Sequence, residues 1–290
     1  MKGEGQALAH GAVGILNAFS TGRGGALGVD LWTRARVTLR NAPGEISGLI
    51  STDPNENNKL CIAVVQKTLQ HFGYERKVSG VVTTSSNIPT AVGLKSSSAA
   101  ANAVALATTS ALGEDPDDDA LLEIGVNASI ECGVSLTGAY DDSFASYYGG
   151  AVLTDNDRRT VRKNLRVPDD IQLLILVPPR KRYTGLLDLS SFGPIRRISE
   201  LAYDEAMCGR IWDAMTLNGL ATSSILGEDP RPALSAIKEG ALGAGLSGKG
   251  PAIVAAVEKD QARRVRVILA KFDGQVIGTR PNFSMATVET

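Results

Sequence analysis

The pattern of apolar and polar residues predicts two β-strands in the first hundred residues. Residues 34–40 (RARVTLR) place apolar side chains on one face and arginines on the other, which is the period-two pattern of a half-buried strand. Residues 78–84 (VSGVVTT) are rich in β-branched side chains and predict a second strand. We expect the arginine face to meet solvent, with contact to a substrate as the alternative.

Helical patterns follow the second strand. The segment that begins at Ser98 (SAAANAVALA) is a strong helix former with serines as candidate N-caps. The acidic run 114–119 (EDPDDD) predicts a turn whose carboxylates cap a helix over 120–131. A long helical stretch is expected over 197–226, with its methionines and tryptophan in the core.

The second half of the chain also mixes both kinds of element. Residues 171–177 (IQLLILV) form a buried type of strand that ends at a proline pair. We expect further strands at 252–257 and 274–279, with an amphipathic helix over 261–272 between them. Because strands and helices occur on both sides of the polar stretch 154–163, the chain is predicted to be an α+β protein. The predicted domains are residues 1–156 and 157–290.

Composition narrows the class of protein. Of the 290 residues, 43% are hydrophobic and 21% are charged, which is typical of a globular chain and excludes wholesale disorder. The 3 cysteines have no paired spacing, so no disulfide framework is expected. With only 2 histidines, the sequence disfavours a Cys/His zinc site and a Ser-His-Asp hydrolase.

Charge and hydropathy indicate which partners to expect. The net charge of −1 and the aromatic content of 5% disfavour a dedicated nucleic-acid binder. No apolar run approaches the roughly 18–20 residues of a membrane span, and the first residues (MKGEGQALAH) lack the apolar region of a secretory signal. We therefore expect a cytoplasmic protein with small-molecule partners and without nucleic-acid or membrane partners. An oligomer is compatible with this sequence.

A glycine- and serine-rich segment before the helix at Ser98 is the first candidate for chemistry. The first turn of a helix carries N–H groups without intrahelical partners and a partial positive charge. Here a glycine lets the backbone wrap an anion, and three serines and a lysine add donors. This combination favours a phosphate site over an ordinary capped helix. The predicted nucleotide-binding residues are Pro89, Thr90, Ala91, Val92, Gly93, Leu94, Lys95, Ser96, Ser97, Ser98 and Ala99.

A second glycine-rich segment, 243–251 (GAGLSGKGP), nearly matches the P-loop of nucleotide-binding proteins. The match fails at its last position, where Gly250 replaces the hydroxyl that would hold Mg²⁺. A P-loop must also be followed by a helix, whereas residues 252–257 predict a strand. The P-loop interpretation is therefore rejected, and a glycine-rich turn beside the phosphate site is the interpretation that remains.

A third segment carries carboxylates. Glu131 lies near the end of a predicted helix, and Asp141 and Asp142 follow in a predicted loop beyond Gly138. Isolated loop carboxylates usually cap helices or face solvent. Adjacent ones near glycines and a phosphate site can instead bind Mg²⁺ or accept a proton. The spacing alone leaves both interpretations open.

Together these segments resemble the kinase family of galactokinase, homoserine kinase, mevalonate kinase and phosphomevalonate kinase, the GHMP kinases. The family's phosphate loop, P-x3-G-L-[small]-S-S-A, is similar to PTAVGLKSSSA at 89–99, and its S-G-x-G-P motif matches SGKGP at 247–251. Mevalonate-kinase-like members place a glutamate eleven residues before an aspartate, with Gly-Gly soon after. Glu131, Asp142 and Gly149-Gly150 have that spacing.

The resemblance implies a fold and a set of roles. The fold would have an N-terminal domain similar to the second domain of ribosomal protein S5 and a ferredoxin-like C-terminal domain. ATP and Mg²⁺ would bind between them, with Ser98 and Glu131 as metal ligands. Asp142 would accept the proton of the acceptor hydroxyl, with Asp141 as the second candidate. Because the phosphate loop has one residue more than is usual, Ser97 competes with Ser98.

One family feature is missing. Mevalonate kinases carry a lysine in their first motif, and the matching residues 11–18 (GAVGILNA) contain none. The cation beside the aspartate or the transferred phosphoryl group must therefore come from elsewhere, with Lys95, Arg23 and Lys249 as candidates.

The wording of the motifs is most similar to that of the archaeal-type shikimate kinases, a branch of this family. That likeness implies shikimate as the phosphoryl acceptor, on the route to chorismate and the aromatic amino acids. A homoserine or mevalonate kinase, a related decarboxylase and a non-catalytic ligand sensor are the alternatives. The basic run 180–182 (RKR) is either a site for the acceptor's carboxylate or a solvated turn.

Overall fold

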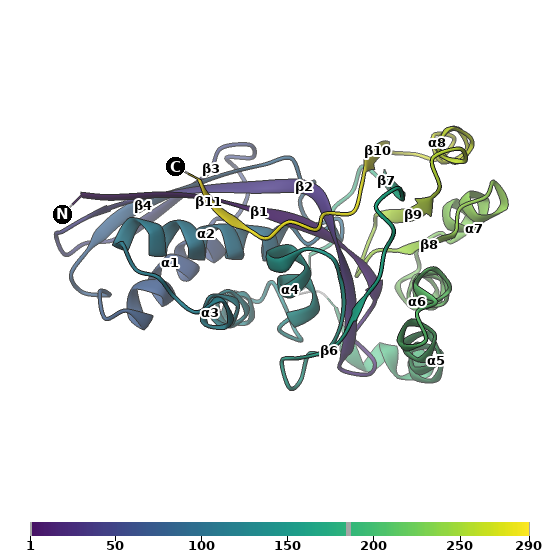
Figure 1. Ribbon diagram of the computed structural model, residues 1–290, viewed down its shortest axis with the longest axis horizontal. Coiled ribbons are helices and arrows are strands. Elements are labelled where there is room, and N and C mark those ends of the chain that lie inside the picture. The colour runs from purple at the N-terminus through teal and green to yellow at the C-terminus, as the bar shows by residue number, and fades with distance from the viewer. Residues whose placement is uncertain (1, 184–186, 290) are drawn as a thin grey trace.

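The computed structural model describes residues 2–183 and 187–289. These residues form two sheets, each covered by helices (Figure 1). The strands of the larger sheet are β1 (Lys2–Leu16), β2 (Arg23–Arg40), β3 (Ile46–Ile50), β4 (Ser79–Ser86), β5 (Ala151–Asp155), β6 (Thr160–Leu165) and β11 (Thr287–Glu289). Those of the smaller sheet are β7 (Gln172–Val177), β8 (Gly243–Leu246), β9 (Ile253–Val257) and β10 (Gln275–Thr279).

Two long antiparallel strands connect the parts of the molecule. The larger sheet has the order β11-β1-β2-β4-β3, and β5 pairs with the opposite end of β2 from the one that β4 uses. Strand β2 therefore extends from the helix-covered body to the edge of the smaller sheet (Figure 1). The last strand, β11, returns beside β1. The order of the smaller sheet is β10-β7-β9-β8.

The first core lies under the larger sheet, against α1 (Lys59–His71), α2 (Ser96–Leu112), α3 (Asp118–Glu131) and α4 (Tyr140–Tyr148). Helix α2 lies very close to β1. A Cβ at Gly3 would lie 1.8 Å from the carbonyl oxygen of Ala111, and one at Gly5 would lie 2.2 Å from that of Ala107. Glycines in the strand and alanines in the helix therefore permit a contact that larger residues would prevent.

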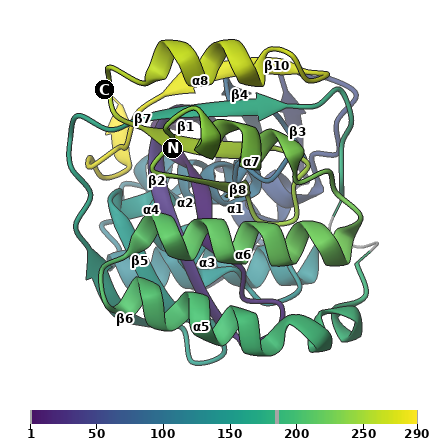
Figure 2. The ribbon, with the colours of Figure 1, turned by 90° about the vertical axis from the view of Figure 1, so that its right-hand side faces the viewer.

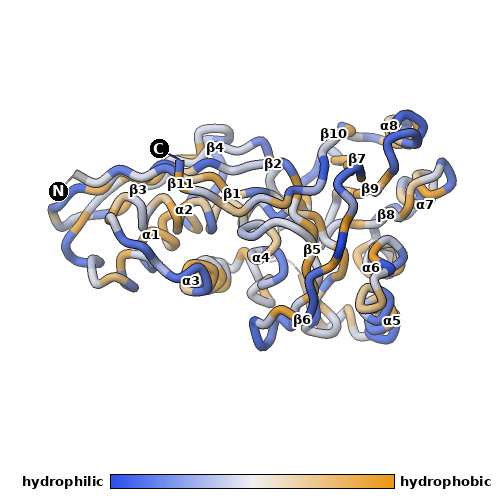
Figure 3. The backbone as a smooth tube through the Cα atoms, in the orientation of Figure 1, coloured by the Kyte–Doolittle hydropathy of each residue, from blue (hydrophilic) through white to orange (hydrophobic). Residues whose placement is uncertain are grey.

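The smaller sheet is covered by α6 (Ile211–Leu226), α7 (Arg231–Lys238) and α8 (Ala262–Leu269), and α5 (Arg196–Met207) packs against α6. All four helices face the viewer in Figure 2. A 3₁₀ segment, η2 (Leu189–Ile195), precedes α5. A second core draws on β1, β2, β7, β9, α5 and α6 and joins the two sheets. In Figure 3 the tube is apolar along β5 and polar at the turn between β5 and β6. Among residues 2–183 and 187–289, no helix has both the length and the apolar character needed to span a bilayer.

The α+β prediction is confirmed, and several predicted elements differ in detail. The helical stretch 197–226 is wrong as one helix, because it breaks into α5 and α6 at Gly209, whose φ is +87°. Helix α2 begins at Ser96 rather than Ser98. The predicted loop around Asp141 and Asp142 is the first turn of α4. Strand β1 and helix α1 were not predicted.

The domain division between residues 156 and 157 stays a prediction. It falls inside the β5–β6 hairpin, whose two strands belong to the same sheet. The described chain passes from the larger to the smaller sheet between Leu165 and Gln172. The return of β11 to β1 also gives the larger sheet a contribution from the last residues.

Candidate active site

The phosphate loop leads directly into the first turn of α2. Lys95 is the N-cap residue and has left-handed backbone angles (φ 58°, ψ 32°). Ser96, Ser97 and Ser98 occupy the first helical turn, where backbone N–H groups have no intrahelical acceptor. All three serines and Lys95 line one cavity of the described chain. The arrangement suits a phosphate group at the end of the helix.

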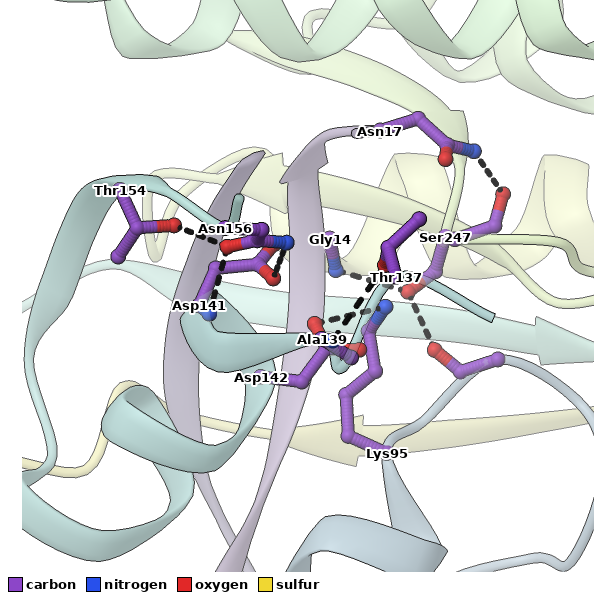
Figure 4. A network of polar contacts seen from close by, with 12 residues as sticks. Gly14, Asn17, Lys95, Thr137, Ala139, Asp141, Asp142, Thr154, Asn156 and Ser247 are labelled. Carbon is purple, nitrogen blue, oxygen red and sulfur yellow. Dashed lines mark hydrogen bonds and ion pairs between the residues drawn. The ribbon is translucent and has the colours of Figure 1, made fainter. Parts of the chain in front are cut away.

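The glycine-rich turn between β8 and β9 packs against this loop. The Ser247 hydroxyl accepts a hydrogen bond from the Gly14 N–H (2.9 Å) and donates one to the Gly93 carbonyl (2.7 Å). A Cβ at Gly93, whose φ is +94°, would lie 2.1 Å from the Ser247 carbonyl oxygen. Glycine is therefore required at residue 93. Figure 4 shows how Ser247 links segments from both sheets.

Asp142 reaches the phosphate loop from α4. Its Oδ1 lies 3.0 Å from Nζ of Lys95, and both side chains are nearly buried, at 13% and 11% exposed (Figure 4). Of the other two candidate cations, Lys249 lines the cavity, and its pKa is lowered to about 8 by burial and by the charge of Lys95. The Arg23 guanidinium lies over the Tyr203 ring, 5.2 Å from its centroid. Lys95 thus forms an ion pair with Asp142, and the charge of Asp142 also acts on Lys249.

Asp141, the neighbour of Asp142, is buried and has different contacts. Its Oδ1 accepts a hydrogen bond of 2.8 Å from Nδ2 of Asn156. Burial, and then the charge of Asp142, raises the pKa of Asp141 to about 7, although Lys95 and the bond from Asn156 oppose the rise. Successive residues of a helix point about 100° apart, so the two aspartates leave α4 in different directions.

Glu131 lies away from this group. It is the last residue of α3, its side chain is 65% exposed, and it forms an ion pair with Lys67 of α1. Ser129 and Cys132 line the cavity, whereas Glu131 does not. Ser98 lines the cavity and Glu131 does not, so a Mg²⁺ site built from both stays a prediction. No cluster of three or more His, Cys, Asp or Glu side chains suited to a metal is found among the described residues.

The cavity holds about 400 Å³ and lies between the phosphate loop, α3, α4 and the strands β2 and β4. Its wall includes the hydroxyl groups of Thr33, Thr84 and Ser86. Its described cationic side chains are those of Lys59, Lys95 and Lys249. The space and the polar lining suit a small polar molecule beside a nucleotide.

The basic run 180–182 does not line the cavity. Arg180 and Arg182 form ion pairs with the buried carboxylate of Glu228. Lys181 pairs with Asp53 (3.1 Å) and Glu56 (2.8 Å). The charges of this segment are therefore paired with carboxylates of the protein. This finding favours neither a site for the acceptor's carboxylate nor a solvated turn.

Sequence reasoning missed two asparagines at the site. Asn17 follows β1, and its Nδ2 donates to the carbonyl of Gly248 (2.9 Å). Asn156 follows β5 and bonds to Asp141 (Figure 4). Asn17 lies in residues 11–18, which were compared with the family's first motif only for the missing lysine. Asn156 lies in residues 154–163, which were interpreted as a polar boundary. Only the fold places both beside the phosphate loop and α4.

Comparison with known proteins identifies the class. The N-terminal domain of GHMP kinases matches residues 59–150, and the C-terminal domain of the same family matches residues 210–274. The homoserine kinase structure from Cytophaga hutchinsonii superposes with a TM-score of 0.77 at 20% identity, covering 100% of this chain and 98% of that one. The Methanococcus jannaschii mevalonate kinase gives a TM-score of 0.75 at 19% identity, over 97% and 98%.

Several relatives are similar over nearly the full chain. A shikimate kinase of Methanosarcina mazei is 40% identical over 98% of this chain and 96% of its own. A shikimate kinase of Pyrococcus furiosus is 38% identical over 92% and 95%. The chain belongs to the GHMP kinase family, and the expected two-domain fold of that family is confirmed.

Proposed function

We propose that this protein transfers the terminal phosphoryl group of ATP to a hydroxyl group of shikimate. The observation that supports phosphoryl transfer is the Lys95–Asp142 pair at the N-terminus of α2, inside a cavity with a hydroxyl-rich wall. Similarity to shikimate kinases at 38–40% identity over nearly the whole chain supports the choice of acceptor. The acceptor and ATP would be its small-molecule partners.

The residues at the cavity have different roles in this transfer. The N–H groups of the first turn of α2 and the hydroxyls of Ser96, Ser97 and Ser98 bind the phosphates of ATP. Asp142 receives the proton of the acceptor hydroxyl. Such transfer depends on positioning and on neutralising charge. Lys95 is placed for the second task, because it lies beside both the loop and Asp142.

The proposal also includes a Mg²⁺ ion and a site for the carboxylate of shikimate. Mg²⁺ neutralises phosphate charge in kinases generally. Of its two predicted ligands, only Ser98 lines the cavity. For the carboxylate of shikimate, Lys59 and Lys249 line the cavity and are therefore better placed than residues 180–182. A cytoplasmic location stays a prediction that cell fractionation tests.

The decisive experiment is an acceptor panel. Purified protein with ATP and Mg²⁺ is offered shikimate, homoserine, mevalonate or galactose, and ADP and the phosphorylated product are measured. We expect shikimate to have the highest kcat/KM. A higher value for homoserine or mevalonate would refute the acceptor assignment and leave the family unchanged. Binding of ATP without formation of ADP with any acceptor would support the ligand-sensor alternative.

A further inference from the structure

Helix α4, which carries Asp142, has no cap from its own sequence. Its N-cap residue is Ala139, whose φ of +45° is uncommon for a residue with a side chain, and no side chain of the N-cap bonds to the helix. The missing acceptor comes from a distant residue. The Oδ1 of Asn156 accepts a hydrogen bond of 3.2 Å from the backbone N–H of Asp141 (Figure 4). Asn156 thus caps the helix from outside.

The same amide also holds a side chain of that turn. Its Nδ2 donates to Oδ1 of Asp141 at 2.8 Å. On the other side of the Asp141 carboxyl group, a Cβ at Gly24 would lie 2.4 Å from Oδ2. The carboxyl group therefore lies between the backbone of β2 and Asn156. Both halves of one amide bind one residue of α4, so the helix can neither rotate nor fray freely at this end.

Asn156 is itself fixed. It is 3% exposed, and its backbone N–H donates to the Gly22 carbonyl at 2.8 Å. The Thr154 hydroxyl donates to its Oδ1 at 2.6 Å. The amide orientation follows from these partners, because Oδ1 meets two donors and Nδ2 meets a carboxylate oxygen. A rigid anchor at the end of β5 is thus joined to the helix that carries Asp142.

We infer that Asn156 is a positioning residue for phosphoryl transfer, which holds the first turn of α4 so that Asp142 faces Lys95 and the cavity. This inference rests on the proposed function. Asp142 follows Asp141 directly, so a shift of the first turn moves the Asp142 carboxylate relative to Lys95, now 3.0 Å away. Misplacement by about 1 Å can lower a rate by roughly 10²-fold.

The test compares Asn156→Ala with Asn156→Asp. The alanine removes both bonds to Asp141. The aspartate has nearly the same shape and keeps an oxygen for the Asp141 N–H, but it can donate to the Asp141 carboxyl group only when protonated. We expect kcat of Asn156→Ala to fall by roughly 10²-fold with little change in the KM for ATP. For Asn156→Asp, kcat relative to the parent should fall as the pH rises.

The charged groups around Asp141 make this pH dependence interpretable. Asp142 and Lys95 act on Asp141 directly. On the neighbouring segments, Arg23 stacks on Tyr203, and Asp155 pairs with Arg162. The parent and Asn156→Ala share these groups, so a pH trend confined to Asn156→Asp reports the introduced carboxyl group. Equal losses at every pH in both variants, or parental kcat in Asn156→Ala, would overturn the inference.

A second measurement does not need turnover. Amide hydrogen exchange of residues 137–148 should accelerate in Asn156→Ala at pH 6 and 8. In Asn156→Asp it should accelerate at pH 8 only. Unchanged exchange in Asn156→Ala would overturn the inference even if no acceptor were phosphorylated. Absence of turnover in the parent with all four acceptors would instead refute the proposed function. Unfolding midpoints of each variant separate these local effects from global instability.

Discussion

The Nζ of Lys95 lies 3.0 Å from Oδ1 of Asp142, although the two residues belong to different motifs of the chain. Lys95 belongs to the phosphate loop and is the N-cap residue of α2, and Asp142 lies in the first turn of α4. The first motif of the chain, at residues 11–18, has no lysine, and the cation at the aspartate is supplied by the phosphate loop instead. One side chain is thus placed to act on the aspartate and on a bound phosphate.

Replacing Lys95 should therefore lower the rate more than it lowers ATP binding. In Lys95→Met the charge beside the transferred group is lost, and we expect kcat to fall by roughly 10²–10³-fold. Lys95→Arg keeps the charge with a different geometry, so its kcat should lie between that of the parent and that of Lys95→Met. Steady-state kinetics with both substrates varied measures the effect. Equal kcat for Lys95→Met and the parent would exclude this role.

Substitution of Asp142 should lower kcat more than substitution of Asp141. Asp142→Asn removes the proton acceptor, and we expect kcat to fall by about 10²–10⁴-fold with ATP affinity nearly unchanged. Asp141→Asn keeps an oxygen for the bond from Asn156 and should cost less. Single-turnover kinetics at saturating ATP and acceptor makes the comparison. A larger loss for Asp141→Asn would show that the aspartate carried over from the family is off by one position.

The sequence predicted elements well where the pattern was local. Strand β9 and helix α8 lie within a few residues of their expected ranges, because a continuous apolar run indicates a buried strand and amphipathic spacing indicates a half-buried helix. Strand β1 was missed, because its glycines interrupt the alternation. Gly3 and Gly5 permit a close contact with α2, and the residues they contact there lie more than a hundred positions away along the chain. No local pattern contains that information.

The candidate site, too, was predicted only where its residues follow one another in the sequence. The phosphate loop was found because its chemistry is continuous in sequence, from Pro89 to Ala99. The loop assigned to Asp141 and Asp142 was wrong, because the acceptor that caps α4 belongs to Asn156 rather than to a preceding serine or aspartate. Likewise, the eleven-residue spacing from Glu131 to Asp142 says nothing about the face of α3 from which a side chain leaves.

Substitution of Glu131 tests whether its spacing in the sequence or its place on the surface of α3 indicates its role. Its exposed side chain pairs with Lys67, and a surface ion pair contributes about 0–1 kcal/mol. We expect Glu131→Gln to leave kcat/KM close to that of the parent, because this side chain is exposed and does not line the cavity. Ser98→Ala, in the cavity wall, should weaken productive binding of ATP with Mg²⁺. A loss of about 10-fold or more in Glu131→Gln would support its predicted role as a metal ligand.

Burial of Asp141 should also make stability depend on pH. Its pKa is raised from 3.8 to about 7, so between these values the folded protein binds a proton that the unfolded chain releases. Stability from this group is therefore present at low pH and is lost as the pH rises through about 7, with a slope of at most about 1.4 kcal/mol per pH unit. Asp141→Asn cannot titrate there, so its free energy of unfolding minus that of the parent should increase from pH 5 to pH 8. Urea denaturation at each pH measures this difference, with Glu131→Gln as the exposed control, for which it should stay flat. A constant difference for Asp141→Asn would mean that Asp141 is already ionised at pH 5 in the folded protein.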